Sequence, residues 1–562
     1  MTFAIDPGTL GGALEKAYRR LEQCRFAEAL RTRRLDVWST DRALQQQIAT
    51  RLGWLDASAI VSPHLPRLRA LAESIRDSGV TDIILLGMGG SSLAPEVLRA
   101  VIGVAPGFPR FQVLDSVDPD AVRAAMARPA TSLFVLASKS GSTIEPNSMA
   151  AEAERRVREA GVSEPGSRFV AITDQDTTLH RRALDRRFRE VFINPADVGG
   201  RYSALSFFGM VPAALMGIDM NALLASARAM AEKCLVDNPR RNPGLALGAV
   251  MAAAALAGRD KLTLSLPPRL EPFGLWVEQL VAESTGKRGK GIVPITGEGG
   301  NVEAGDAPLG DDRVIVRIVL AGGPHASGSV DRECAAHLPT VSLDMPDLAA
   351  LGAEFFRWET AAATAGLLLD INPFDEPNVR QAKDATRVLL DAHSAQGRLP
   401  VPEPDAVIEG VRMTLTGRAR QAIEGPLTFL RLLRPPDYFG LLVYLPPEDE
   451  AFARVLQELR HNVAAKTGCA TTLGYGPRYL HSTGQLHKGG PNTGGFIIMT
   501  AEVSPDLPIP GEPYSFGVLE LAQASGDFES LNRTGRRALH LHLPQRDPDM
   551  LRRIGDRLIR AG

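Results

Sequence analysis

The sequence has few cysteines and no long hydrophobic run. Its four cysteines, Cys24, Cys234, Cys334 and Cys469, lie far apart and form neither a C-x-x-C pair nor a zinc-finger spacing. Scattered cysteines are typical of reduced thiols in a cytoplasmic protein. The longest apolar runs, such as residues 248–256, are far shorter than the roughly 20 residues that a membrane helix needs. The start, MTFAIDPG, lacks the pattern of a signal peptide, so we expect a cytoplasmic location.

An excess of one charge is also absent. The 63 Lys and Arg residues are balanced by 65 Asp and Glu residues, which gives a formal net charge of -2. This balance argues against a nucleic-acid binder and against a membrane-surface protein. An anionic ligand would have to be held locally, by loops and a few side chains.

The sequence does contain a regular alternation of strand-like and helix-like segments. A helical pattern over residues 8–57 is followed by short apolar runs, such as SLFVLA and RFVAIT, that end in glycine or polar residues before helical stretches. This alternation predicts parallel sheets covered on both faces. A second series begins at KLTLSLPP, and a third follows the proline-rich segment RLPVPEPD at 398–405.

The predicted fold class is therefore α/β, with two doubly wound parallel-sheet domains, a helical N-terminal segment and an extended or rearranged C-terminal α/β region. With 562 residues the chain is too long for a single core. We expect four parts, at residues 1–60, 61–257, 258–400 and 401–562.

A hydroxyl-rich loop gives the strongest local signal. The predicted strand SLFVLA ends at residue 137, a helix is expected from about residue 144, and four hydroxyls crowd between them: Ser138, Ser140, Ser142 and Thr143. Hydroxyl donors, loop N–H groups and the positive end of a helix dipole suit a phosphate dianion. The alternative is a well-capped helix in a serine-rich turn.

Two further loops have the same strand–loop–helix pattern. In LLGMGGSSLAPE, Gly89 and Gly90 would let a ligand approach the backbone beside Ser91, and the spacing matches neither a dinucleotide fingerprint nor a Walker loop. In ADVGGRYSAL, Arg201 follows Gly200 at the start of an apolar stretch. A planar cation at the mouth of a sheet suits developing negative charge, although a surface salt bridge is the simpler interpretation.

These loops, in this order, resemble those of the phosphoglucose isomerase family. The segments GGRYS at 199–203 and SKSGSTIE at 138–145 are similar to a family signature and to its phosphate loop. Three more segments resemble the parts that carry the family's glutamate, lysine and histidine: VAESTGK at 281–287, INPFDEPNVRQAK at 371–383 and RYLHSTGQ at 478–485. The matches span roughly residues 80–540.

The resemblance implies two sugar-isomerase (SIS-type) domains and a set of site residues. Glu283, His481, Lys383 and Arg201 would be catalytic, without a cofactor or metal. The expected substrate-binding residues are Gly90, Ser91, Ser138, Lys139, Ser140, Ser142, Thr143 and Gly200. Family members are commonly dimers, so a homodimer is expected.

This chain also departs from the family pattern. Its histidine segment follows the lysine signature instead of preceding it, an order similar to the isomerase half of bifunctional transaldolase/phosphoglucose isomerase proteins, which suggests a functional link to transaldolase. Within the lysine signature, Glu376 replaces the usual glutamine, Arg380 the usual glutamate and Asn378 the usual glycine.

The residues themselves support an enediol mechanism. Glu283 shares a helix face with Trp276, Gln279 and Leu280, so it should be half-buried, and it lies in the last turn, where the helix dipole disfavours negative charge. Both effects raise a carboxyl pKa toward that of a useful base, although an exposed helix-end glutamate is the alternative. By resemblance, His481 and Lys383 would open the sugar ring, and Arg201 would stabilise the enediolate.

A metal-dependent hydride shift would need clustered carboxylates and histidines. His481 and His487 are six residues apart, while His540 and His542 alternate on a predicted strand and should face one side. Neither pair has acidic residues at metal-ligand spacing, so no metal is expected.

The sequence therefore predicts interconversion of glucose 6-phosphate and fructose 6-phosphate. One alternative is a dual phosphoglucose/phosphomannose isomerase. The other is a non-catalytic SIS-type sugar-phosphate sensor, which would have no reason to keep the four catalytic candidates together and would usually carry a DNA-binding helix.

Overall fold

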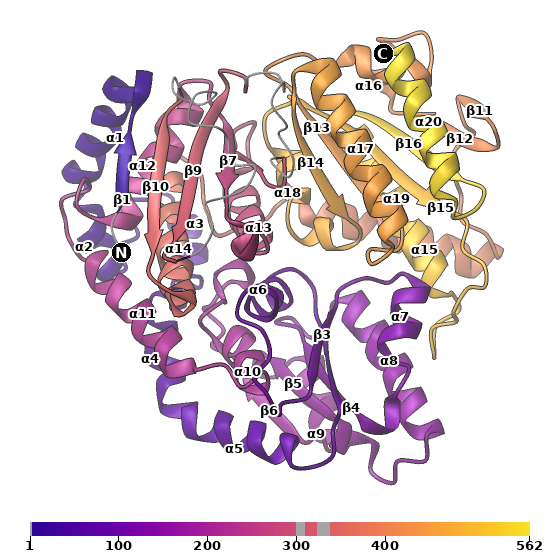
Figure 1. Cartoon of the computed structure of the whole chain (residues 1–562), viewed down its shortest axis with the longest axis horizontal. Helices are drawn as coiled ribbons and strands as arrows, with labels where there is room; N and C mark the ends of the chain where they lie inside the picture. Colours follow the sequence, from indigo (N-terminus) through magenta and orange to yellow (C-terminus); the bar gives the residue numbers. More distant parts are fainter. Residues whose placement is uncertain (1–2, 299–308, 323–337) are drawn as a thin grey trace.

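The computed structural model describes residues 3–298, 309–322 and 338–562. These residues form three separate β-sheets with helices packed around them, which confirms the α/β fold class with mostly parallel strands. Figure 1 shows the first sheet at the bottom, the second at the upper left and the third at the upper right. Cys334 lies outside the described residues, and Cys24, Cys234 and Cys469 are free thiols.

The first sheet is wholly parallel, in the order β3-β2-β4-β5-β6. Its strands are β2 (Asp82–Leu86), β3 (Arg110–Leu114), β4 (Ser132–Ala137), β5 (Phe169–Thr173) and β6 (Glu190–Ile193). Its helices are α5 (Leu65–Arg76), α6 (Leu93–Val101), α7 (Pro119–Ala125), α8 (Ile144–Glu159), α9 (Thr178–Asp185) and α10 (Phe207–Leu215). Every residue of β2, β4 and β5 is buried, as a parallel sheet covered on both faces requires.

The second sheet has the order β1-β10-β9-β7-β8. Its strands are β7 (Lys261–Ser265), β8 (Val293–Ile295), β9 (Arg313–Leu320) and β10 (Thr340–Met345), all parallel, and the antiparallel β1 (Phe3–Asp6). The sequence analysis did not predict β1, which begins the chain and pairs with β10.

Long helices cover the second sheet and connect it to the other two. The first part of the chain contributes α1 (Gly11–Gln23), α2 (Phe26–Arg31), α3 (Arg42–Ala49) and α4 (Ala57–Val61). The middle contributes α11 (Met220–Lys233), α12 (Pro243–Leu256), α13 (Phe273–Thr285), α14 (Leu351–Leu368) and α15 (Val379–Gln396). All residues of α14 are buried, so this helix forms the centre of the largest core.

The third sheet has six strands in the order β11-β12-β16-β15-β13-β14. The parallel strands are β13 (Tyr438–Tyr444), β14 (Ala470–Tyr475), β15 (Gly494–Ala501) and β16 (Arg537–Leu543), and β11 (Ala406–Ile408) and β12 (Val411–Leu415) run antiparallel at one edge. Its helices are α16 (Gly417–Arg420), α17 (Glu450–Thr467), α18 (Gly484–Gly489), α19 (Phe516–Arg533) and α20 (Pro548–Ala561). The predicted C-terminal region is thus a complete sheet, parallel apart from two edge strands, with its own core.

The third sheet is tied to the first by paired charges. Arg478, beyond the end of β14, makes a bidentate contact with the buried Asp115, beyond the end of β3, at 2.7 and 2.8 Å. Arg546 pairs with Asp118 and, at 2.5 Å, with Asp120. The carboxyl ends of the two sheets therefore face each other, and this is where ligands collect in doubly wound folds.

Candidate functional site

A cleft of about 510 Å³ lies where the loops of the three sheets meet. Eleven of the twelve predicted site residues line it: Gly90, Ser91, Ser138, Lys139, Ser140, Thr143, Gly200, Arg201, Glu283, Lys383 and His481. Ser142 does not line the cleft, because its hydroxyl turns back to bond the Ser140 hydroxyl at 3.1 Å. Residues far apart in the sequence are thus gathered in one place.

One side of the cleft is the hydroxyl-rich loop between β4 and α8. The Ser138 hydroxyl donates to the Thr143 hydroxyl at 3.2 Å and accepts from the Gly141 N–H at 3.1 Å. Thr143 occupies the N-cap position of α8, but its side chain makes no capping hydrogen bond. The first turn of this 16-residue helix therefore has no side-chain cap from Thr143, which is an arrangement that favours anions, although Pro146 contributes no N–H there.

The glycines of the second loop line the cleft, and they also allow a close approach between segments of the chain. A Cβ on Gly90 would lie 2.0 Å from the Gly200 carbonyl oxygen, and one on Gly89, at φ +54°, would lie 2.7 Å from the His481 carbonyl oxygen. These glycines let the loop after β2 pack against the last loop of the first sheet and against the His481 segment of the third sheet. At Gly200, by contrast, a Cβ would meet nothing within 4 Å, so this position stays open to the cleft.

Lys139 is already paired within the structure. Its ammonium contacts the Asp174 carboxylate and donates to the Ala196 carbonyl at 2.8 Å. Burial raises the pKa of Asp174, and the Lys139 ammonium opposes that rise. The role of Lys139 in substrate binding stays a prediction.

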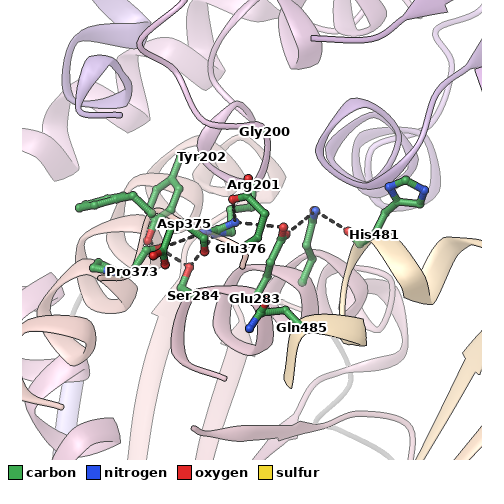
Figure 2. Close-up of polar contacts among 12 residues, drawn as sticks. Gly200, Arg201, Tyr202, Glu283, Ser284, Pro373, Asp375, Glu376, His481 and Gln485 are labelled. Atoms are coloured by element: carbon green, nitrogen blue, oxygen red, sulfur yellow. Dashed lines mark hydrogen bonds and ion pairs between the residues drawn. The ribbon is translucent and has the colours of Figure 1, made fainter. Parts of the chain in front are cut away.

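The opposite side of the cleft carries Glu283 and Arg201 in direct contact (Figure 2). The Arg201 Nη1 atom lies 3.0 Å from Glu283 Oε1 and 3.2 Å from Glu376 Oε2, so one guanidinium serves two carboxylates. Glu283 is 8% exposed, more buried than expected, because α13 is packed against β8 and α14. Burial raises the pKa of Glu283, and the Glu376 charge adds to the rise while Arg201 opposes it.

Backbone and side-chain bonds hold Arg201 in this position. Its Nε donates to the Ser284 hydroxyl at 3.0 Å, and its Nη2 donates to the carbonyls of Pro373 and Asp375 at 2.9 and 2.8 Å. Arg201 lies in the 3-10 helix η7 (Gly200–Tyr202), so the first sheet's last loop is fixed to the helix end that carries Glu283. The guanidinium is buried and cannot swing away from the cleft.

Lys287, the last residue of the segment VAESTGK, supports the cleft from behind. Its buried ammonium donates to the Asn372 carbonyl at 2.7 Å and to Asp375 Oδ1 at 2.6 Å. Burial and the nearby Arg201 lower the pKa of Lys287 to about 8. Lys287 therefore joins the end of α13 to the loop before α15.

His481 has a buried carboxylate partner that the sequence analysis missed. His481 Nε2 lies 2.8 Å from Glu145 Oε1, and the same oxygen accepts from Gln523 Nε2 at 2.7 Å. Burial of Glu145 opposes its ionisation, yet His481 holds its pKa below the ordinary value. Glu145 is the last residue of SKSGSTIE, so an acidic residue in the first turn of a helix beside the phosphate loop was the available signal.

Gln279 connects Glu283 to the His481 segment. Its Nε2 donates to Glu283 Oε2 at 3.1 Å and to the His481 carbonyl at 2.8 Å. Lys383 reaches the cleft from the first turns of α15; its side chain is exposed and makes no hydrogen bond or ion pair with the residues that the structure describes. Its charge contributes to lowering the Glu145 pKa, so Lys383 and His481 act on the same region.

Three other histidines, His487, His540 and His542, lie outside this cleft. His487 is buried beside Phe496, with ring centroids 4.8 Å apart, and burial lowers its pKa well below the ordinary value. His540 and His542 face the same side of β16, as predicted, because both bond the Thr500 hydroxyl. Over residues 3–298, 309–322 and 338–562, no group of three His, Cys, Asp or Glu side chains has metal-binding geometry. Within the same ranges no helix is long and apolar enough to span a membrane.

Two solved structures share this fold. A hypothetical protein from Thermus thermophilus has a TM-score of 0.57 at 24% identity, covering 69% of this chain and 99% of its own. A glucose-6-phosphate isomerase from Chlamydia trachomatis has a TM-score of 0.54 at 20% identity, covering 68% of this chain and 86% of its own. The fold and cleft thus define an α/β protein of parallel sheets with a ligand site at their carboxyl ends.

Sequence relatives give the family. The glucose-6-phosphate isomerase of Parasynechococcus marenigrum is 31% identical over 358 residues, which are 56% of this chain and 64% of that enzyme. A probable glucose-6-phosphate isomerase of Haloarcula marismortui is 30% identical over 57% of this chain and 81% of its own length. The sequence pattern of phosphoglucose isomerase matches residues 56–312. The chain belongs to the phosphoglucose isomerase family, although it spans less than two thirds of the cyanobacterial relative.

Proposed function

We propose that this protein interconverts glucose 6-phosphate and fructose 6-phosphate through ring opening and a cis-enediolate, without a metal. The observation that carries the proposal is the contact between a buried carboxylate, Glu283, and a fixed guanidinium, Arg201, facing an anion-binding loop across one cleft. The names of the sequence relatives support the same activity.

The phosphate is placed at the N-terminus of α8. There the hydroxyls of Ser138, Ser140 and Thr143 and the first-turn N–H groups would surround its oxygens. Glu283 lies on the opposite side of the cleft. A phosphate bound at this end would therefore direct the sugar carbons toward Glu283. The phosphate contacts then fix the distance between C1, C2 and the base.

His481 and Lys383 would open the ring by moving protons between the ring oxygen and the C1 hydroxyl. The hydrogen bond to Glu145 would orient the His481 imidazole toward the cleft, as a carboxylate partner does for a general acid. Glu283 would then remove the C2 proton and return it to C1. Its raised pKa suits this work, and Arg201 would stabilise the enediolate oxygens.

The first experiment is a coupled assay of fructose 6-phosphate conversion, in EDTA, for the wild type and Glu283→Gln. We expect EDTA-resistant turnover in the wild type and a loss of about 10³-fold or more in the variant, within the range of a general base. Glu271→Gln, at an exposed position just before the same helix, is the matched control and should keep full activity. Normal turnover in Glu283→Gln would place the base elsewhere.

Two other functions are separated by the same assay. A dual-specificity enzyme would also convert mannose 6-phosphate, the C2 epimer. A sensor would bind sugar phosphate without turnover in the wild type. The contact between Glu283 and Arg201 and the His481–Glu145 pair favour the isomerase, because a sensor needs neither a base nor an oriented acid.

The remaining expectations complete the proposal. We propose a cytoplasmic homodimer in which the divisions at residues 60, 257 and 400 separate the functional parts. The histidine-bearing third sheet follows the lysine-bearing helix, and this order supports the resemblance to the isomerase half of transaldolase/phosphoglucose isomerase proteins. Sedimentation of the purified chain tests the dimer.

A further inference from the structure

A second cavity, of about 980 Å³, lies between α15, α19 and one face of the third sheet. It shares no lining residue with the cleft described above. The sheet face forms its floor, the two helices form its walls, and the proline-rich segment at 398–405 forms part of its rim through Pro400, Val401 and Pro402. Its volume is that of a site for a small organic ligand.

The floor is polar and ordered by cross-strand pairs. Arg412 of β12 lies opposite His542 of β16, and Thr414 lies opposite His540. His540 Nε2 and His542 Nδ1 each lie 2.8 Å from the Thr500 hydroxyl oxygen. Burial lowers the pKa of His540 to about 3 and also lowers that of His542. Both imidazoles are therefore neutral at pH 7, and the floor carries a single charge, that of Arg412.

Arg412 is a half-buried cation that lacks a counter-ion. Its guanidinium makes no hydrogen bond or salt bridge with any residue in the part of the chain that the structure describes. The other two arginines of the cavity are paired, Arg420 with Asp405 at 2.6 Å and Arg533 with Glu529 at 2.7 Å. A half-buried guanidinium without a partner is costly, so this position favours an anion.

The two remaining acidic residues of the cavity do not neutralise Arg412. Glu502 has a side chain that is 66% exposed and lies 3.5 Å from His542 Nε2. Asp384 is exposed on α15. Neither forms an ion pair with Arg412 among the described residues.

The walls carry apolar side chains that are unusually accessible. Val388 of α15 is 66% exposed and Val401 is 38% exposed, and both line the cavity opposite Phe528 of α19. Branched apolar side chains left open beside an unpaired guanidinium suit a ligand with an anionic group and a carbon skeleton.

We propose that this cavity binds a small organic phosphate. The phosphoryl oxygens pair with the Arg412 guanidinium and the Thr414 hydroxyl, which makes no hydrogen bond among the described residues, and the organic part packs against Val388, Val401 and Phe528. Guanidinium groups pair bidentately with phosphate, and a hydroxyl donor adds a third contact to a tetrahedral group.

Both walls also hold parts of the proposed active site. On α15, Lys383 lines the cleft while its neighbour Asp384 lines the second cavity. On α19, Gln523 donates to Glu145, the partner of His481, while Ser525 lines the cavity. The two helices pack against each other. Ligand binding should therefore change the kcat/KM of the isomerase reaction. This consequence rests on the proposed function, whereas ligand binding to the second cavity does not.

The test is calorimetric titration with phenyl phosphate as the probe. We expect two equivalents to bind the wild type, one in each cavity, and one equivalent to bind Arg412→Gln. Arg418→Gln removes the same charge from an exposed position nearby and should keep two. Two equivalents on Arg412→Gln, or a single equivalent on the wild type that Arg412→Gln leaves unchanged, would overturn the proposal.

The variant Val388→Ser distinguishes binding of an organic phosphate from binding of a simple anion. The variant should fold normally because the Val388 side chain is exposed. We expect it to weaken phenyl phosphate at the second cavity at least fivefold and to leave inorganic phosphate unchanged. Inorganic phosphate that binds there as tightly as phenyl phosphate, with no effect of Val388→Ser on either, would overturn the assignment to an organic phosphate. These binding results do not depend on turnover, so failure of this proposal can be distinguished from failure of the isomerase proposal.

Discussion

The two sides of the cleft are built in different ways. The phosphate side comes from one continuous loop, between β4 and α8, together with the short loop after β2 on the same sheet. The proton-handling side is assembled from three distant segments, which contribute Glu283 from α13, Lys383 from α15 and His481 from the end of the loop after β14. One side needs only local folding, and the other needs all three sheets in place.

This difference separates binding from chemistry. The loop hydroxyls are held by bonds within the loop, such as Ser138 to Thr143 at 3.2 Å. The acid and base are held by bonds between sheets, including Gln279 to the His481 carbonyl and Arg478 to Asp115. We therefore expect substitutions on the loop to change KM and substitutions on the other side to change kcat.

After Glu283→Gln, the largest effect should come from Arg201→Gln. Loss of the guanidinium removes the positive charge beside the enediolate, so we expect kcat to fall about 10²- to 10³-fold in the coupled assay. Because Arg201 also bonds two carbonyls, thermal unfolding of the variant is measured alongside. Arg201→Lys, which keeps the charge, should recover part of the activity; a kcat equal to that of the wild type in Arg201→Gln would refute the assignment.

Glu145→Gln should have the next largest effect. The amide keeps the shape but loses the carboxylate that holds the His481 ring, so we expect kcat to fall about 10²-fold while KM for fructose 6-phosphate stays within twofold. Glu159→Gln, near the exposed end of the same helix, is the control. A rise in KM without a loss in kcat would mean that Glu145 belongs to the phosphate side.

Thr143→Ala should affect binding alone. Losing one hydrogen bond from a protein hydroxyl to the charged phosphate costs about 1.4 kcal/mol of binding free energy. This corresponds to a roughly tenfold rise in KM with kcat little changed. Ser142→Ala removes a hydroxyl of the same loop that does not line the cleft, and it should leave KM unaltered. The same KM in Thr143→Ala and Ser142→Ala would show that the loop binds the phosphate only through its backbone.

Glu376→Gln should give the smallest change, a shift in the pH profile. A base must be deprotonated, so the raised pKa of Glu283 places the acid limb of kcat/KM above the ordinary carboxyl range. The Glu376 charge contributes to the raised pKa of Glu283, so its loss lowers that pKa. Its loss also leaves the Arg201 guanidinium to pair with Glu283 alone. Both effects move the acid limb to lower pH. An acid limb that moves to higher pH would contradict the shared-guanidinium geometry.

The same contrast explains what the sequence could predict. The end of β4 at Ala137 and the start of α8 at Ile144 agree with the prediction, because a buried strand and a hydroxyl-rich turn are local patterns. The contact between His481 and Glu145 joins residues 336 positions apart, and no periodicity indicates it. The strands β3 and β8 were missed because they are short or partly exposed.

The glycine pair shows a subtler failure. The sequence correctly placed Gly89 and Gly90 at the cleft, but the reason for glycine there is the close approach of two other loops, which depends on how three sheets meet. The resemblance to a family supplied Glu283, His481 and Lys383, which isolated residue patterns leave ambiguous. Packing between distant segments was the missing information in each case.

The strand at the start of the chain has a consequence for how the protein is made. Phe3 pairs with Leu343, so β1 has no strand partner during synthesis until β10 has left the ribosome. Contacts between such distant segments form slowly, since a long loop must close first. The first sheet, whose strands are consecutive in the chain, can fold earlier. The nascent protein would thus complete its phosphate loop long before the base is fixed opposite it.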